Sequence, residues 1–265
     1  NIGWYFAIND YMDLALQGDI YTNLSYAINV TSSYVKRYKY SGSIEFRYED
    51  NHTGLRNTPS YSSSNAFKFR WSHRQDSKAH PHRSFSANVN LVSSKFNQYT
   101  TNLSDYFNNT TTSSIAFSTK LGSYWNLTAN LGESYNVNTG AISLDLPSVS
   151  VSTTQIYPFR KKKKQGKNKW YEDISLSYRV NMINKIDTYD TLLTSPDIFK
   201  SFRNGIIHSL PIQSNVKILK HLNWTNSIDY TERWYSNSIS KTYNPQTDLI
   251  DKDTTYGFIA NRKAK

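Results

Sequence analysis

Apolar and polar residues alternate along much of the chain with a period of two. In residues 83–92, one side of an extended chain carries Phe85, Ala87, Val89 and Leu91, and the other carries Ser86, Asn88 and Asn90. Successive side chains of a β-strand point to opposite faces of its sheet. The pattern therefore predicts a strand with one apolar and one polar face.

The same alternation recurs in segments before and after this one. Their apolar positions are Met12, Leu14 and Leu16; Tyr26, Ile28 and Val30; Ile44, Phe46 and Tyr48; Phe67, Phe69 and Trp71; Ile115 and Phe117; Trp125, Leu127 and Ala129; Ile142 and Leu144; Ile174, Leu176, Tyr178 and Val180; and Val216, Ile218, Leu222 and Trp224. We expect roughly ten to twelve strands, many of them about ten residues long.

Strand length and aromatic placement point to a membrane. A tilted strand needs about 9–11 residues to cross a bilayer, whereas soluble strands most often have about 5–6. Aromatic residues gather towards the strand ends, as in the girdles of membrane barrels: Tyr21, Tyr34, Tyr40, Tyr48, Trp71, Trp125, Tyr157, Trp170, Tyr171 and Trp234. We predict an all-β fold, an antiparallel transmembrane β-barrel with lipid on its apolar side and a wet lumen on its polar side.

The connections between strands differ in length. Residues 22–25 and 121–124 form short connections, whereas residues 49–64, 73–83, 95–113 and 186–204 form long polar ones. We expect short turns on one side and long loops on the other, as in outer-membrane barrels. A soluble β-sandwich or solenoid explains the alternation equally well, but it explains strand length and loop asymmetry less well.

Composition excludes several classes. Hydrophobic residues make up only 37%, yet aromatic residues reach 15%, which argues against disorder. The absence of cysteine excludes a disulfide scaffold, cysteine zinc sites and thiol catalysis. The sequence contains no run of 18 apolar residues, so it predicts no transmembrane helix. The sequence starts at Asn1 without an initiator Met or signal peptide, so we expect part of a longer protein.

The formal net charge of +11 is concentrated in one basic stretch. It consists of Arg160, Lys161, Lys162, Lys163 and Lys164, flanked by the aromatic residues Tyr157, Phe159, Trp170 and Tyr171. Basic and aromatic residues together can bind nucleic acid. The same arrangement is expected where an aromatic girdle meets a loop beside lipid phosphates, or at a solvated hairpin tip. We predict a phosphate-contacting loop and no nucleic-acid partner.

Catalytic motifs are absent from the sequence. The carboxylate pairs Asp10/Asp13 and Glu172/Asp173 fall at strand starts, and no G-x-S-x-G, Walker or H-E-x-x-H motif occurs. A stretch that reads as a loop holds His73, Asp76, His80 and His82. Metal ligands need rigid neighbouring elements, so this stretch predicts no metal site. We predict no cofactor and no enzyme activity.

Three stretches resemble one family of outer-membrane proteins. They are GWYFAINDYMDLALQGDIYTNLSYAINVTSSYVKRYKYSGSIEFRY (3–48), FRWSHRQDSKAHPHRSFSANVNLVSSKFN (69–97) and IYPFRKKKKQGKNKWYEDISLSY (156–178). They resemble the barrel of LptD, the lipopolysaccharide-assembly protein, and most closely its Bacteroidota-type branch. The resemblance implies that residues 1–265 are a single partial β-barrel domain, the N-terminal portion of a large barrel. On this resemblance we expect residues 1–265 to include neither the family's periplasmic jelly-roll nor its closing strands.

The resemblance also implies a function. The family inserts lipopolysaccharide into the outer leaflet through a lateral gate, as an integral protein of the outer membrane. Expected partners are lipopolysaccharide, outer-membrane lipid, an LptE-like plug lipoprotein and the periplasmic Lpt bridge. One lip of the gate would be the first strand, with Trp4, Tyr5, Phe6, Ala7 and Ile8. Better-known members interrupt their opening strands with proline, which residues 7–10 of this chain lack.

Two other functions remain open at this point. A porin or TonB-dependent nutrient channel would carry a plug domain or charge rings in its lumen. A soluble β-rich surface adhesin would need no detergent for solubility.

The inside–outside assignment is tested at two adjacent residues of one strand. Leu127→Arg should block membrane assembly, because a cation on the lipid side costs about 2–4 kcal/mol at the bilayer midplane. Asn126→Arg should be tolerated, since its side chain would lie in the lumen. Heat-modifiable migration in gels and membrane fractionation measure assembly, and equal tolerance of the two variants would contradict the assignment.

Overall fold

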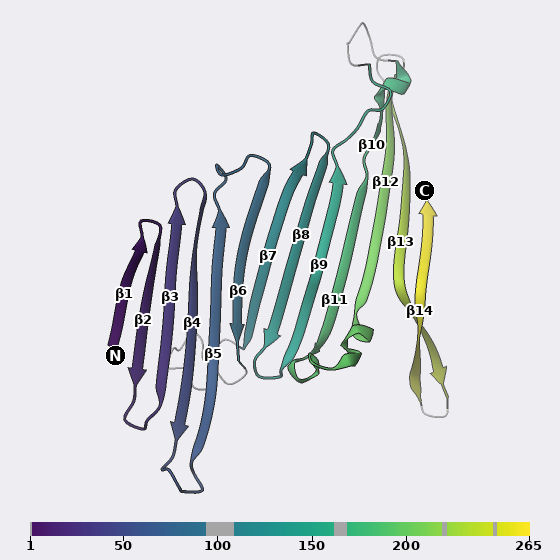
Figure 1. The fold of residues 1–265 in the computed structure, drawn as a ribbon. Helices are drawn as coiled ribbons and strands as arrows, with labels where there is room; N and C mark the ends of the chain where they lie inside the picture. The colour runs from purple at the N-terminus through teal and green to yellow at the C-terminus, as the bar shows by residue number, and fades with distance from the viewer. Residues whose placement is uncertain (1, 94–108, 162–168, 219–221, 246–247) are drawn as a thin grey trace. The chain divides into compact units, whose positions relative to one another are not determined.

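β-Strands make up nearly all of the fold (Figure 1). The computed structural model describes residues 2–93, 109–161, 169–218, 222–245 and 248–265. The strands are β1 (Ile2–Asn9), β2 (Met12–Ile20), β3 (Tyr26–Lys36), β4 (Tyr40–Thr53), β5 (Ser62–Gln75), β6 (Arg83–Val92), β7 (Thr110–Leu121), β8 (Trp125–Asn136), β9 (Ala141–Thr153), β10 (Ile174–Leu176), β11 (Arg179–Tyr189), β12 (Arg203–Ile218), β13 (Leu222–Asn244) and β14 (Leu249–Ala264). The short helical turns are η1 (Trp170–Asp173), η2 (Asp190–Leu192) and η3 (Pro196–Ser201). None of the helical segments in these ranges has the length and apolarity of a transmembrane span.

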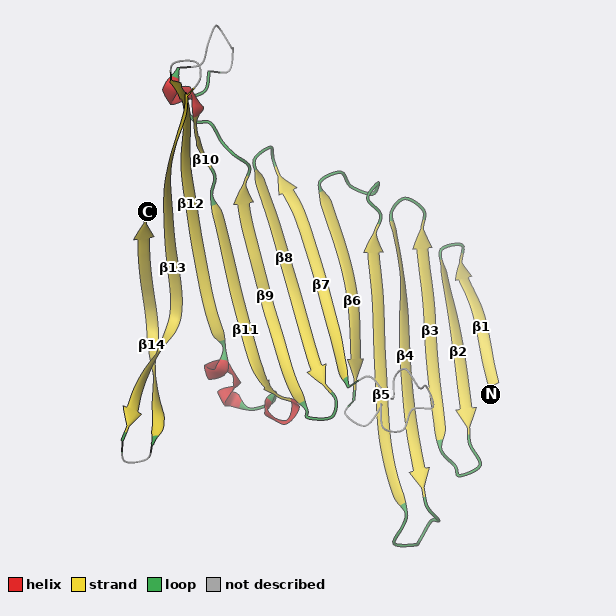
Figure 2. Cartoon of the chain, turned by 180° about the vertical axis from the view of Figure 1, so that it is seen from behind, coloured by secondary structure: helices red, strands yellow, loops and turns green. Residues whose placement is uncertain are grey.

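The strands follow one another as an antiparallel meander (Figure 2). Their hydrogen-bonded order is β1 to β9, then β11 to β14, and the short β10 pairs with β12. The chain divides into two compact units. Unit 1 comprises residues 1–117, 130–145 and 186–201, and unit 2 comprises residues 118–129, 146–185 and 202–265. The all-β, antiparallel class predicted from the alternation is confirmed.

Strand register in unit 1 joins the apolar positions into continuous rows. One row crosses six strands, from β1 to β6, through the directly opposed residues Trp4, Leu16, Val30, Phe46, Phe69 and Leu91. The adjacent row on the other side consists of Tyr5, Ala15, Thr31, Glu45, Arg70 and Asn90. The sheet therefore has an apolar side and a polar side, as the period-two pattern predicts.

Burial is reversed relative to a soluble domain. Large apolar side chains on the apolar side are exposed, for example Trp4 at 61% and Phe67 at 45%. Fully covered residues in unit 1 are mostly small or polar, such as Ala27, Glu49 and Lys68. A small apolar cluster in the same unit consists of Tyr135, Val137 and Ile142. Such a distribution is favourable when the apolar side meets hydrocarbon instead of water.

Aromatic rings gather at one end of β3 to β6, on the apolar side. The Trp71 Nε1–H donates to the Tyr34 hydroxyl over 2.9 Å, and that hydroxyl lies 2.8 Å from His73 Nδ1. Tyr40 stacks on the His73 ring, and Phe85 contacts it from β6. We call Tyr34, Tyr40, Trp71, His73 and Phe85 the aromatic group. Three of its members come from the predicted girdle.

Unit 2 has its own aromatic row. Ring contacts link Trp125, Tyr178, His208, Trp234 and Phe258 in that order. The same side of β12 and β13 carries Ile206, Leu210 and Ile212 opposite Trp234, Tyr230 and Ile228. One ion pair interrupts this apolar side, where Glu232 accepts hydrogen bonds from Tyr230, Trp234 and Arg262.

The described residues form 14 strands, more than the ten to twelve expected. The expected segment from Ile174 to Val180 divides into β10 and β11, and the one from Val216 to Trp224 spans parts of β12 and β13. β14 was missed, because the run LIDKDTTYGFIANRKA (249–264) contains few alternating apolar residues.

The predicted sorting of loops by length was wrong. Residues 54–61 and 76–82 flank the same strand, β5, so they lie at its opposite ends. The short connection 21–25 lies at the same end of unit 1 as 54–61, since two strands separate them in the meander. Much of the expected loop at 95–113 lies outside the described residues.

One glycine in β4 makes room for the aromatic group. Gly42 is directly opposite Tyr34 on β3 and His73 on β5, and an added Cβ would clash with the Tyr34 ring and the Ser72 carbonyl oxygen. Gly42→Ala should therefore destabilise the protein by about 1–3 kcal/mol, the usual range for overpacking. The midpoint of urea unfolding in detergent micelles measures this.

Gly18→Ala is the matched control, because its added Cβ would lie 3.9 Å from the nearest atom outside its own stretch of chain, the Ile2 carbonyl oxygen. That is an ordinary van der Waals distance, so its midpoint should stay near that of the wild type. Equal midpoints for both variants would mean that the Tyr34 ring moves aside freely.

Candidate functional site

The predicted gate strand lies within β1. Among the described strands, β1 pairs only with β2, and every residue of β1 is exposed. Trp4 and Phe6 lie on the apolar side, opposite Leu16 and Leu14. Tyr5 and Ala7 lie on the polar side, opposite Ala15 and Asp13. This strand thus presents apolar and polar positions alternately at an edge of the described sheet.

Ile8 interrupts the pairing of β1 with β2. The register shifts between Ala7, which faces Asp13, and Asn9, which faces Met12. Such a bulge leaves one residue without a direct partner and bends the strand. Beyond it the Asn9 side chain accepts a hydrogen bond from the Tyr11 N–H and closes the turn. The end of β1 is therefore held by fewer ladder bonds than its middle.

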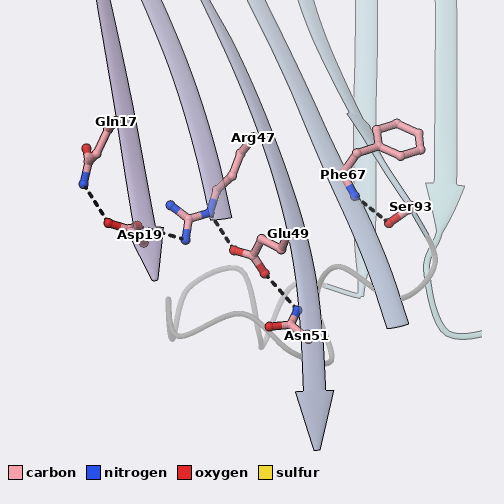
Figure 3. A network of polar contacts seen from close by, with 7 residues as sticks. All are labelled: Gln17, Asp19, Arg47, Glu49, Asn51, Phe67 and Ser93. Atoms are coloured by element: carbon pink, nitrogen blue, oxygen red, sulfur yellow. Dashed lines mark hydrogen bonds and ion pairs between the residues drawn. The ribbon is translucent and has the colours of Figure 1, made fainter. Parts of the chain in front are cut away.

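The polar side of β2 and β4 carries a chain of charged contacts (Figure 3). The Arg47 guanidinium donates to Glu49 over 2.6 Å and lies 3.9 Å from a carboxylate oxygen of Asp19. Gln17 donates to Asp19, and Asn51 donates to Glu49. We call Gln17, Asp19, Arg47, Glu49 and Asn51 the polar ladder. Its carboxylates are buried, yet both lie beside the same cation.

The sequence explains how residues of two separate strands meet. Arg47, Glu49 and Asn51 are spaced by two along β4, so they share a face. On the intervening strand, Ala27 lies directly between Asp19 and Glu49. Its methyl group is short enough for the Arg47 side chain to reach both carboxylates. The alternation of Ile44, Phe46 and Tyr48 predicts Arg47 on the polar side, but no sequence signal predicts the ladder, since the contact depends on register.

A pocket of about 350 Å³ opens beside the ladder, lined by Tyr21, Asn23, Ser25, Glu49 and Asn51, among others. Its lining offers hydroxyl, amide and carboxylate groups. Ser25 already accepts a hydrogen bond from the His52 N–H and Asn23 donates to the His52 carbonyl. Such a surface exchanges hydrogen bonds with hydroxyl-rich molecules much as it does with water.

The basic stretch is only partly described. Lys162, Lys163 and Lys164 lie outside the described residues. The Arg160 guanidinium covers the Tyr157 ring at 3.5 Å and lies 3.5 Å from a carboxylate oxygen of Asp173. Lys161 is exposed. Arg160 and Lys161 belong to unit 2, whereas the gate strand belongs to unit 1.

The other candidate groups have structural partners. The Asp13 carboxylate accepts from the Ser33 N–H at 2.7 Å and from the Tyr5 hydroxyl at 3.4 Å. Glu172 accepts from the Lys169 N–H at the start of η1. His73 belongs to the aromatic group, apart from the turn that holds His80 and His82. The described residues contain no group of three or more potential metal ligands.

Removal of the ladder's cation should destabilise the protein. Arg47→Gln leaves the buried Asp19 and Glu49 carboxylates without their common partner, which we expect to cost about 2 kcal/mol. The triple variant Asp19→Asn/Arg47→Gln/Glu49→Gln should be more stable than Arg47→Gln alone, because no uncompensated charge remains. Urea unfolding of the folded protein in micelles measures both.

Arg70→Gln is the control on the neighbouring strand. Its ion pair with Glu45, at 3.7 Å, is much more exposed, so its loss should cost under about 1 kcal/mol. A triple variant less stable than Arg47→Gln would show that the ladder's charges stabilise the protein as a set.

Comparison with known proteins agrees with this geometry. No curated protein matches the chain. A family profile described as "LptD protein" matches residues 1–265, the whole sequence. That family consists of outer-membrane β-barrel proteins of transport and assembly, with lipopolysaccharide as substrate and the Lpt machinery as partner. Its barrel class accords with the antiparallel, two-sided strands of the structure. The chain therefore belongs to the LptD family and serves the transport of lipopolysaccharide to the outer membrane.

Proposed function

We propose that this chain forms part of an integral outer-membrane translocon that inserts lipopolysaccharide into the outer leaflet through a lateral gate. The observation that carries the proposal is the two-sided register that begins at β1 and continues through β6. Lipopolysaccharide has acyl chains that need an apolar surface and a glycan that needs a polar one. Strands with one surface of each kind match this division.

β1 would form one lip of the gate. A lip must separate from its neighbour on the far side without unfolding, so it needs firm pairing on one side only. β1 has seven directly opposed residue pairs with β2, and the bulge at Ile8 weakens the pairing only at the C-terminal end of β1. The bulge supplies a local weakness in a strand without proline. β2 and β3 would hold the lip in place from behind.

The glycan would pass along the polar side. There Asn29, Thr31 and Asn90 offer hydrogen-bonding groups, and the ladder's charges are largely paired with one another. Paired charges present many donors and acceptors but only a weak net field, which suits passage without tight binding. No bond is made or broken in this step.

Partners and the basic stretch complete the proposal. An LptE-like lipoprotein would occupy the lumen, and the periplasmic Lpt bridge would deliver lipopolysaccharide. Arg160 and Lys161 would contact phosphates of lipid A or of the core sugars, because guanidinium and ammonium groups form strong charge-assisted hydrogen bonds with them.

Photo-crosslinking tests the gate. A photoreactive amino acid at Phe6, on the apolar side of β1, should give lipopolysaccharide adducts several-fold more often than the same residue at Phe46. Phe46 lies on the same apolar side, in the row next to that of Phe6, but in an interior strand of the described sheet. Adducts are detected in the full-length protein in living cells with an antibody against lipopolysaccharide. Equal yields at both positions would contradict a gate at β1.

A functional readout accompanies the crosslinking. Cells depleted of the native copy are complemented by each photoreactive variant before irradiation, and lipopolysaccharide on their surface is labelled. Both variants should restore labelling, which shows that the protein carrying the probe still works. Unchanged surface labelling after depletion alone would contradict the translocon itself.

A further inference from the structure

Two neighbouring turns of unit 1, with the strand end beside one of them, carry four cations, of which three are exposed and Lys36 is half-buried. One turn joins β3 to β4 and the other joins β5 to β6, and a hydrogen bond from the Asp76 N–H to the Lys39 carbonyl ties them together. We call the cations of these turns, Lys36, Arg37, Lys39 and Lys78, the basic rim. Among the described residues none of the four forms an ion pair. The acid of these turns, Asp76, accepts a hydrogen bond from the Lys78 N–H.

Aromatic faces hold three of the rim's four cations in place. Arg37 and Lys78 come from different turns, yet each lies 4.9 Å from the centre of the Tyr38 ring. Lys36 lies 5.2 Å from the centre of the Tyr11 ring. A cation over a ring keeps its full charge and its N–H donors, whereas a carboxylate would neutralise it. The rim is therefore positioned and still free to bind an anion.

Tyr38 occupies this position at a conformational cost. Its φ is 62°, in the left-handed region that residues other than Gly, Asn and Asp rarely adopt. The ring is 49% exposed, so burial does not explain the choice of a large aromatic residue. A strained residue that places a ring between two cations of separate turns points to a function for the ring.

The cations of the polar side contrast with those of the rim. Arg47 and Arg70 each contact carboxylates, at 2.6 and 3.7 Å. The same unit thus pairs its cations on the polar side and leaves them unpaired at one end of its strands. Cations that form no ion pair within the protein can bind an anionic group that lies at the ends of the strands.

The rim lies directly beyond the aromatic group. Tyr34 and Tyr40 flank the turn that holds Lys36, Arg37 and Lys39, and Tyr40 stacks on His73 near the end of β5. Tyrosine and tryptophan mark the depth of lipid headgroups in membrane proteins. The order along the strands is therefore apolar surface, aromatic group and cations, which follows the order of acyl chain, glycerol region and phosphate in a bilayer.

We propose that the basic rim, with Tyr38 as its platform, binds the phosphate of a bilayer lipid headgroup. The inference rests on the proposed membrane insertion and adds a lipid site to it. The phosphate would accept hydrogen bonds from Arg37 and the lysine ammonium groups while the acyl chains lie along the apolar side. Such a contact would fix the depth and tilt of β3 to β6 in the membrane.

Native mass spectrometry of the folded, full-length protein tests the proposal with phosphatidylglycerol and phosphatidylcholine as probes. The variant Lys36→Gln/Lys39→Gln/Lys78→Gln should bind phosphatidylglycerol at least about tenfold more weakly, because each basic residue near an anionic surface adds to the attraction. Binding of phosphatidylcholine should change far less. A variant that binds phosphatidylglycerol as the wild type does would overturn the proposal.

The control removes the same charges elsewhere. Lys241→Gln/Lys252→Gln/Lys263→Gln takes three exposed lysines from β13 and β14, and it should retain wild-type binding. An equal loss in both triple variants would mean that only net charge matters, against a defined site. Displacement of phosphatidylglycerol by an equal concentration of inorganic phosphate would likewise contradict a lipid site.

Tyr38→Gly separates binding from folding. Glycine accepts the positive φ without strain, so the turn should form at least as well, yet the platform for Arg37 and Lys78 is lost. We expect normal assembly with weaker binding of phosphatidylglycerol; unchanged binding would overturn the role of the ring. Heat-modifiable migration and membrane fractionation check every variant. If the wild type fails to insert, the membrane proposal fails; if insertion holds and binding is equal, only the lipid site fails.

Discussion

Strand register is the constraint on which the rest of the structure depends. The residues that lie opposite one another across β1 to β6 stay on one face of the sheet, so that Trp4, Val30 and Leu91 belong to one row. A slip of one residue in any pair would turn a whole strand over and place charges among the aromatic side chains. Hydrocarbon penalises such an error heavily, because it can neither solvate a charge nor pair a free backbone group. The two faces and the chemistry assigned to each follow from this one requirement.

The cations of unit 1 make two different kinds of contact. On the polar side Arg47 binds two carboxylates and contributes to the stability of β2 and β4. At the strand ends Arg37 and Lys78 contact the ring of Tyr38 and keep their charge available. The first arrangement gives a wet surface of low net field, suited to a passing glycan. The second gives a fixed anion-binding surface, suited to a phosphate that stays.

The fold could be predicted from the sequence because a period-two pattern is visible within each segment, whichever strand that segment pairs with. The five alternating segments between Met12 and Leu91 lie where they were predicted, and register joined their apolar residues on one side. β14 was missed, since only Tyr256, Phe258 and Ala260 alternate within its long polar run. The polar ladder needs Asp19 and Glu49 to flank Ala27, which depends on two registers that no local pattern specifies. The loops were sorted wrongly because length was considered without strand direction.

The two kinds of cation contact differ in one further respect. A carboxylate already neutralises the cation that it contacts, whereas an aromatic ring leaves the charge of its cation intact. An anion that approaches Arg47 would have to displace Glu49 at 2.6 Å, whereas one that approaches Lys78 need not displace Tyr38. The cations of the passage wall would thus keep their own partners, while those at the strand ends could hold an anion that comes from outside.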